Sequence, residues 1–229
     1  MTHASFLVAM KNIAPHAIPM WVAAIFGMAL LVLGLAGCAG PDRPVRPVLY
    51  DFGPGAMQPQ AATRIAPLPA IALAEVEAGP ALDSSAILYR LGYADGHQLR
   101  PYAQARWTAS PAQLVRQRLR EHLSLQRTVL NLGEGAAIAR SGGQAALVLR
   151  LELEEFTHWF ESPTQSSGVL RLRATAAENT AGGEKLLAQR AFIVQRPAAT
   201  ADAQGGVRAL AAATDAAAQE LSQWLQQLR

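Results

Sequence analysis

Apolar and polar side chains alternate in several short stretches between residues 68 and 195. Successive side chains of a strand point to opposite faces of a sheet, so this alternation predicts β-strands. Gly79-Pro80, Asp95-Gly96 and Gly182-Gly183 lie between the stretches and are sequences typical of turns. We expect strands over residues 69–77, 87–91, 97–103, 127–131, 145–160, 169–176 and 186–195, with a short first strand at 48–52.

The longest predicted strand changes the parity of its apolar positions part of the way along. Leucines occupy odd positions up to Leu153, whereas Phe156 and Phe160 occupy even ones. Because side chains alternate strictly along a strand, this change requires one extra residue. We therefore predict a β-bulge near Glu154-Glu155.

Three-and-four spacing of apolar residues predicts two helices. Ser110-Pro111-Ala112-Gln113 has the sequence of a capping box, so the first helix should begin there and run to about Leu125. The second is the C-terminal helix. The predicted apolar stripes are Leu114, Val115, Leu119 and Leu123 in the first helix, and Val207, Leu210, Ala211, Thr214, Ala218, Leu221, Trp224, Leu225 and Leu228 in the second.

The other face of the first helix carries Arg116, Arg118 and Arg120. We interpret these arginines as a solvated face rather than as a surface for anionic headgroups. Strands with two amphipathic helices predict one mixed α-β domain, in which the helices bury their stripes on the open face of the sheet. The expected fold is a single domain at residues 67–229, with a mixed, largely antiparallel sheet packed by two helices.

The N-terminal segment has a different character. An apolar run from Trp21 to Leu33 follows Lys11 and precedes small residues, which is the plan of a secretory signal. A transmembrane anchor is the alternative, but the run is nearer to signal-peptide length and no cluster of Lys or Arg follows it. We predict a signal peptide at residues 1–37 that begins at Met1 or at Met10.

Leu35-Ala36-Gly37-Cys38 resembles the lipobox of bacterial lipoproteins. The resemblance implies that Cys38 becomes the first residue of the mature chain and carries a diacylglyceryl group and an N-acyl chain. Ala39, where an aspartate would favour the inner membrane, implies anchoring in the outer membrane on its periplasmic side. Residues 38–66 are rich in Pro and Gly, so we expect a tether that lets the domain search for a partner at high effective concentration.

Composition narrows the function further. The 20 Lys and Arg residues and 17 Asp and Glu residues are spread thinly, without the basic run that would indicate nucleic acid. With Cys38 acylated, no thiol remains for a disulfide or a cysteine metal site. The sequence has no H-E-x-x-H motif, no G-x-S-x-G elbow and no phosphate-binding loop. We therefore expect neither an enzyme nor a metal or other cofactor beyond the acyl chains.

Residues 81–123 resemble the auxiliary lipoprotein family of ABC-type transport systems, the group that includes paraquat-inducible protein C. The matching positions are Leu82, Ser85, Ile87, Tyr89, Arg90, Tyr102, Ala103, Arg106, Trp107, Pro111, Leu114, Leu119 and Leu123. Phe156 and Phe160 with Ser166-Ser167, and the terminal helix, also fit this pattern. The resemblance thus covers nearly all of the mature chain.

This resemblance implies a function in transport across the cell envelope. The expected partners are an MCE-domain protein and the components of an ABC transporter, and the expected substrates are phospholipids or other hydrophobic molecules. Homo-oligomerisation is left open. Two alternatives also remain open: a carrier that binds an acyl chain between the sheet and the terminal helix, and a scaffold for assembly of the outer membrane.

Five residues are candidates for the partner surface, because aromatic and arginine side chains dominate interface hot spots. They are Tyr89, Arg90, Tyr102, Arg106 and Trp107. Structural roles compete with this interpretation. Tyr102 and Trp107 could seal the sheet where the first helix begins, and we favour that role for Trp107. Arg90 could pair with Glu75 or Glu77.

Overall fold

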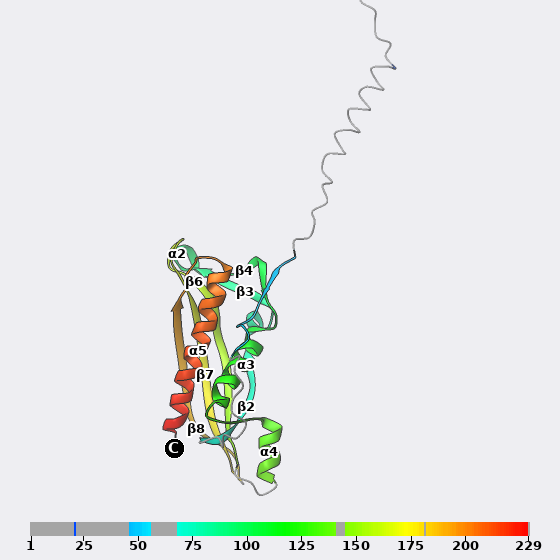
Figure 1. Cartoon of the computed structure of the whole chain (residues 1–229), viewed down its shortest axis with the longest axis vertical. Coiled ribbons are helices and arrows are strands. Elements are labelled where there is room, and N and C mark those ends of the chain that lie inside the picture. The colour runs from blue at the N-terminus through cyan, green and yellow to red at the C-terminus, as the bar shows by residue number, and fades with distance from the viewer. Residues whose placement is uncertain (1–20, 22–45, 56–67, 141–144, 181, 229) are drawn as a thin grey trace, which may run out of the picture. The chain divides into compact units, whose positions relative to one another are not determined.

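The computed structural model describes Trp21 and residues 46–55, 68–140, 145–180 and 182–228. These residues include eight strands of one mixed sheet, with two long helices packed on it (Figure 1). The strands are β1 (Val48–Tyr50), β2 (Leu68–Ala78), β3 (Ala86–Leu91), β4 (Gly96–Trp107), β5 (Arg127–Asn131), β6 (Leu147–Phe160), β7 (Ser166–Thr180) and β8 (Gly183–Pro197). The mixed α-β domain predicted from the sequence is confirmed.

The sheet divides in two along one edge of β6. The first half of β6 pairs in parallel with β2, and its last residues pair in parallel with β3. On its other edge β6 pairs with β7 in an antiparallel ladder, and β7 pairs in turn with β8. β5 extends the β2 branch, whereas β4 and then β1 extend the β3 branch. Among the described residues, β8 pairs only with β7, so its outer edge is unpaired.

The predicted bulge in β6 is confirmed. Leu153 lies opposite Leu172 of β7, whereas Glu155 lies opposite Arg171. Glu154 is therefore the extra residue that shifts the alternation of side chains. Because of this shift Leu153 and Phe156 both point into the core, each 1 % exposed.

Two helices cover one face of the sheet. α3 (Pro111–Ser124) packs on β2 and β5, α5 (Ala203–Gln227) packs on β7 and β8, and the two helices also contact each other. Leu119, Leu123, Leu210 and Leu221 of the predicted stripes are fully buried. Complete burial of each leucine contributes about 1.5–3 kcal/mol to folding. The helices thus close the core as the spacing predicted.

The capping-box prediction is wrong in its chemistry, although the helix begins where expected. Ser110 is the N-cap residue of α3, but its side chain makes no capping hydrogen bond. Its backbone carbonyl accepts a hydrogen bond from the Leu114 N–H at 3.1 Å. In α5 the side chain of Asp202 does cap the helix, accepting from the Gly205 N–H at 2.7 Å.

Further helical segments lie between the predicted strands. They are a 3-10 helix at Pro80–Leu82, α2 (Gly92–Asp95) and α4 (Leu132–Arg140). The sequence analysis did not predict α4. Gly135 lets α4 approach β2, because a Cβ atom there would lie 2.9 Å from the Cβ of Ala72. This close approach is a tertiary contact that local patterning does not reveal.

The compact unit that contains the sheet begins at Arg46. β1 therefore belongs to the domain, and the boundary predicted at residue 67 lies inside this unit. The predicted signal peptide at 1–37, Cys38 and most of the predicted tether lie outside the described residues. None of the helices in the described part of the chain has the length and apolar character needed to cross a bilayer.

Candidate partner-binding surface

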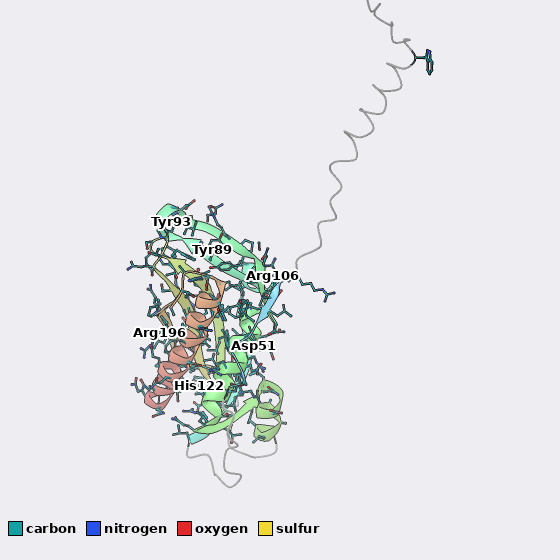
Figure 2. The ribbon with its side chains drawn as sticks, turned by 45° about the horizontal axis from the view of Figure 1, so that its top comes forward. Asp51, Tyr89, Tyr93, Arg106, His122 and Arg196 are labelled. Carbon is teal, nitrogen blue, oxygen red and sulfur yellow. The ribbon has the colours of Figure 1, made fainter. Side chains whose placement is uncertain are left out.

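The five candidate residues lie on β3 and β4, two antiparallel strands that α2 connects. The structure distributes them among three places rather than gathering them into one patch. Tyr89 and Tyr102 meet near α5, Arg90 lies on the other face of the sheet, and Arg106 and Trp107 lie beside β1. Figure 2 shows that Tyr89 lies closer than Arg106 to Tyr93 of α2, whereas Arg106 lies near β1.

An aromatic cluster surrounds Tyr89 and Tyr102. Their ring centroids are 4.7 Å apart, and the Tyr89 ring is also 5.9 Å from that of Phe160. The Tyr102 hydroxyl lies 2.8 Å from Nδ1 of His158, a hydrogen bond between β4 and β6. His158 is completely buried, and its ring centroid is 4.4 Å from that of Phe160. Tyr102 thus seals the sheet beside the start of α5 rather than where the first helix, α3, begins, and both tyrosine residues stay partly exposed.

Burial keeps the Tyr102–His158 pair uncharged at neutral pH. Removal from water lowers the pKa of His158 from 6.5 to about 4, although the carboxylates of Asp202 and Glu161 act in the opposite direction. Burial also raises the pKa of Tyr102, and Tyr89 and Asp202 act in the same direction. α5 packs directly against this pair, because a Cβ atom on Gly206 would lie 2.4 Å from Nδ1 of His158.

Arg90 forms an ion pair, but with neither partner considered from the sequence. Its Nε donates to Oε1 of Glu155 at 3.0 Å, and its Nη1 donates to the carbonyl groups of Gly96 and His97 at 3.2 Å each. Glu75 pairs instead with Arg116 of α3 at 3.1 Å. Arg90 therefore ties the start of β4 to β6, and its side chain is 21 % exposed.

Arg106 and Trp107 are held by the domain itself. The Arg106 guanidinium donates to the carbonyl groups of Tyr102 and Ala105. Trp107 is 2 % exposed, and its ring contacts Phe52 at 5.6 Å and Phe156 at 5.8 Å between centroids. This is the sealing role that we favoured for Trp107, and it leaves almost no ring surface for a partner.

Tyr93 is an exposed aromatic residue that the sequence analysis did not single out. It lies on α2, between the two strands that carry the candidates, and it is 49 % exposed. Trp159 of β6 fixes this turn, because Cβ atoms on Gly92 and Gly96 would lie 2.2 Å and 2.9 Å from its ring. The sequence feature that could have identified Tyr93 is an aromatic residue next to a predicted turn. We call Tyr89, Arg90, Tyr93 and His97 the hairpin tip.

The arginines of α3 bind neighbouring protein groups rather than forming a purely solvated face. Arg118 donates to both carboxylate oxygens of Asp215 on α5, at 2.6 and 3.1 Å. His122 lies 3.0 Å from the same carboxylate. Arg120 donates to the Val129 carbonyl at 2.9 Å. These contacts join α3 to α5 and β5, so the arginines are occupied within the fold.

Two surface hollows flank the segment that follows β1. The smaller, of about 150 Å³, lies toward α3 and is lined partly by Phe52, Leu114 and Arg118. The larger, of about 350 Å³, lies toward α5 and is lined partly by Leu49, Val207 and Arg208. Pockets for small ligands typically have volumes of about 300–1,000 Å³.

In the described part of the chain, no three His, Cys, Asp or Glu side chains group as metal ligands.

The fold is similar to that of solved structures. Protein XCC0632 from Xanthomonas campestris, of the family DUF330, is 16 % identical with a TM-score of 0.57, over 82 % of this chain and 90 % of that one. A second, uncharacterised protein is 13 % identical with a TM-score of 0.56, over 79 % of this chain and 99 % of that one. At these identities the likeness establishes the fold alone.

The family follows from the sequence match. The family described as the ABC-type transport auxiliary lipoprotein component matches residues 50–222, from the end of β1 to the last turns of α5. The chain belongs to this family, as the resemblance of residues 81–123 indicated. The family is a class of auxiliary lipoproteins in transport rather than a class of enzymes. No curated protein matches the chain.

Proposed function

We propose that this chain is the periplasm-facing auxiliary component of an ABC transport system that contains an MCE-domain protein. Its substrates would be phospholipids or other hydrophobic molecules that cross the envelope. The observation that carries the proposal is the family match over residues 50–222, directly behind a lipobox at Cys38. Cys38 would carry the acyl chains and anchor the domain in the outer membrane.

The physical need for such a component comes from the aqueous gap between two membranes. Each CH₂ group of an acyl chain exposed to water costs about 0.8 kcal/mol. A covered path avoids that cost, and a lipoprotein anchored at one end can hold the path in place. The domain supplies a folded surface for this purpose, built on a large buried apolar core.

The hairpin tip is the surface that we propose for the partner. Tyr93 is 49 % exposed and is mounted on a turn that Trp159 holds in place. Tyr89 is partly exposed next to it, and Arg90 is oriented by Glu155. Exposed aromatic side chains such as those of Tyr93 and Tyr89 are typical of interface hot spots, whereas Arg90 lies on the other face of the sheet and is bound to Glu155. Trp107 is buried, and Arg106 lies beside β1 rather than at the hairpin tip, so neither belongs to this surface.

The packing of α5 supports the auxiliary role over the lipid-carrier alternative. Ala213, Ala217 and Ala218 of α5 are each 0 % exposed. A Cβ atom on Gly168 of β7 would lie 2.5 Å from the backbone nitrogen of Leu210. The alanines therefore allow the helix and the strand to pack closely, and the interface between α5 and the sheet is filled where the carrier alternative needs room.

Copurification tests the proposed function. The full-length tagged lipoprotein is purified from envelopes in mild detergent, and the accompanying proteins and lipids are identified by mass spectrometry. We expect an MCE-domain protein with its ABC components, and a loss of about tenfold in their recovery for Tyr93→Ala, because one hot-spot side chain contributes about 1.4 kcal/mol. Leu125→Ala is a matched control, because Leu125 is 45 % exposed at the end of α3.

Other outcomes would overturn the proposal. Recovery of a β-barrel assembly protein would support the scaffold alternative. A stoichiometric lipid without protein partners would support the carrier alternative. Equal losses for Tyr93→Ala and Leu125→Ala would remove the hairpin tip from the contact surface while leaving the partner identified.

A further inference from the structure

β1 fixes the start of the domain firmly in the sheet. Val48 and Tyr50 lie opposite Ala105 and Trp107 of β4 in a parallel register. The Thr108 N–H donates to the Tyr50 carbonyl at 2.8 Å. The ring of Phe52 then packs against the buried ring of Trp107 at 5.6 Å between centroids. Residues 48–52 therefore belong to the folded domain and do not act as a tether.

This attachment shortens the distance over which the anchored domain can range. The next step rests on the proposed acylation of Cys38. Val48 lies ten positions after Cys38, and a fully extended chain of that length spans at most about 33–36 Å. A free tether over the whole predicted range of 38–66 would span roughly 100 Å. The domain thus remains beside the membrane that holds its acyl chains.

The surface around β1 has the composition expected for contact with lipid headgroups. Val48 and Leu49 are large apolar residues that are 54 % and 62 % exposed. Arg46 is exposed beside them, Arg106 lies opposite Leu49 on β4, and Arg208 of α5 lines the same hollow as Leu49. Asp51 also lines that hollow. The three arginines and Asp51 together carry three positive charges and one negative charge.

We infer that the β1 surface, made of Arg46, Val48, Leu49, Arg106 and Arg208, lies against the anionic headgroups of the membrane in which Cys38 is anchored. Arginines near an anionic leaflet contribute about 1 kcal/mol each through electrostatic attraction. Exposed apolar side chains add to this when they enter the interface. The short distance to Cys38 keeps the surface close to the bilayer, so the membrane-bound state is populated even when the contact is weak.

The opposite edge of the sheet offers a matched control position. β8 is separated from β1 by β4, β3, β6 and β7 along one branch of the sheet. Five strand spacings correspond to about 24 Å. Ile193 of β8 is 67 % exposed, close to the 62 % of Leu49. The two positions therefore differ in their place in the sheet but hardly in exposure or side-chain type.

Site-directed fluorescence tests the inference on the full-length lipoprotein. Cys38 is the only cysteine, so in the acylated protein Leu49→Cys or Ile193→Cys introduces the one free thiol. Each variant is labelled with nitrobenzoxadiazole and reconstituted into vesicles of phosphatidylethanolamine and phosphatidylglycerol that contain brominated phospholipid. We expect several-fold stronger quenching at position 49 than at position 193. Equal quenching at the two positions, or none at position 49, would overturn the inference.

Two controls separate this inference from the proposed function. The mass of the amino-terminal peptide shows whether Cys38 is acylated. A missing acyl group would contradict the proposed function, whereas an acylated protein without quenching would contradict only the membrane contact. Val48→Cys places a second label on the other face of the same edge strand, in case a label at position 49 disturbs β1. Replacing phosphatidylglycerol with phosphatidylcholine should lower the quenching, and unchanged quenching would overturn the role of anionic headgroups.

Discussion

The Tyr102 hydroxyl and Nδ1 of His158 lie 2.8 Å apart where β4, β6 and the start of α5 meet. His158 is completely buried and Tyr102 is half-buried, so this hydrogen bond joins two strands under the helix. Removing the hydroxyl with Tyr102→Phe keeps the ring in place but leaves His158 without this partner. We expect a loss of about 1 kcal/mol in the free energy of unfolding, measured in urea at pH 7.

The same pair predicts a loss of stability in mild acid. Burial lowers the pKa of His158 to about 4 in the folded protein, whereas the unfolded value is 6.5. Between these values the unfolded state binds the extra proton, so the free energy of unfolding falls as the pH decreases from about 6.5 to 4. The full effect is on the order of 3 kcal/mol.

Urea unfolding at a series of pH values checks this expectation. The carboxylates of Asp202 and Glu161 also face His158. The pKa of Asp202 is lowered below 3.8, so Asp202 is protonated mainly at a lower pH than the range from 6.5 to 4. The variant His158→Phe should lack the decrease between pH 6.5 and 4. Identical pH profiles for this variant and the natural chain would contradict our assignment.

Gly206 should not tolerate alanine, although alanine favours helices. A Cβ atom there would lie 2.4 Å from Nδ1 of His158, so the helix or the ring would have to move. We expect Gly206→Ala to lower the free energy of unfolding by about 1–3 kcal/mol. Gly133→Ala in α4 is the control, because nothing lies within 4 Å of its added Cβ, and it should be neutral or stabilising by up to about 1 kcal/mol.

Asp215 holds the two helices together through Arg118 and His122. Both partners lower the pKa of its carboxyl group, against the effect of burial. The Asp215 side chain is 37 % exposed, so water screens the interaction, and we expect Asp215→Asn to cost about 1 kcal/mol. Glu184→Gln removes the more exposed pair with Arg150 and should cost less than about 0.5 kcal/mol. Equal effects in urea unfolding would contradict a special role for the helix contact.

Phe52 should control whether β1 stays in the sheet. Its ring contacts both Trp107 and Phe156, at 5.6 Å and 5.9 Å between centroids. Phe52→Ala should increase hydrogen exchange at Thr108, whose N–H donates to Tyr50, and should destabilise the domain by about 2 kcal/mol. Val48→Ala removes a residue that is 54 % exposed and should leave that exchange unchanged.

Local patterns predicted the features that depend on neighbours along the chain. The bulge at Glu154 follows from the parity of leucines and phenylalanines, because alternation in a strand is strict. The stripe of α5 follows from helical spacing, and even Thr214 fits it, with its hydroxyl donating to the Leu210 carbonyl at 2.9 Å inside the core. The family resemblance also lay in local order, and the match over residues 50–222 confirms it.

Contacts between distant segments could not be predicted in this way. Arg90 pairs with Glu155 because β3 lies parallel to the end of β6. The sequence of neither strand predicts this pairing. His158 is enclosed by Tyr102 of β4 and Gly206 of α5, which are both distant from it in the sequence. Gly135 lies where α4 approaches β2 so closely that a Cβ atom would be 2.9 Å from the Cβ of Ala72. Each depends on which elements pack together rather than on their own composition.

The unpaired edge of β8 bears on how the protein avoids aggregation. Among the described residues its backbone groups have no partner strand on that side, and Leu186 and Ile193 are 63 % and 67 % exposed along it. Such an edge is a template for further strands. Lys185, Arg190 and Arg196 are spaced along the same strand, so two copies that met edge to edge would bring like charges together. We expect these three cations to oppose the pairing of β8 with a further strand.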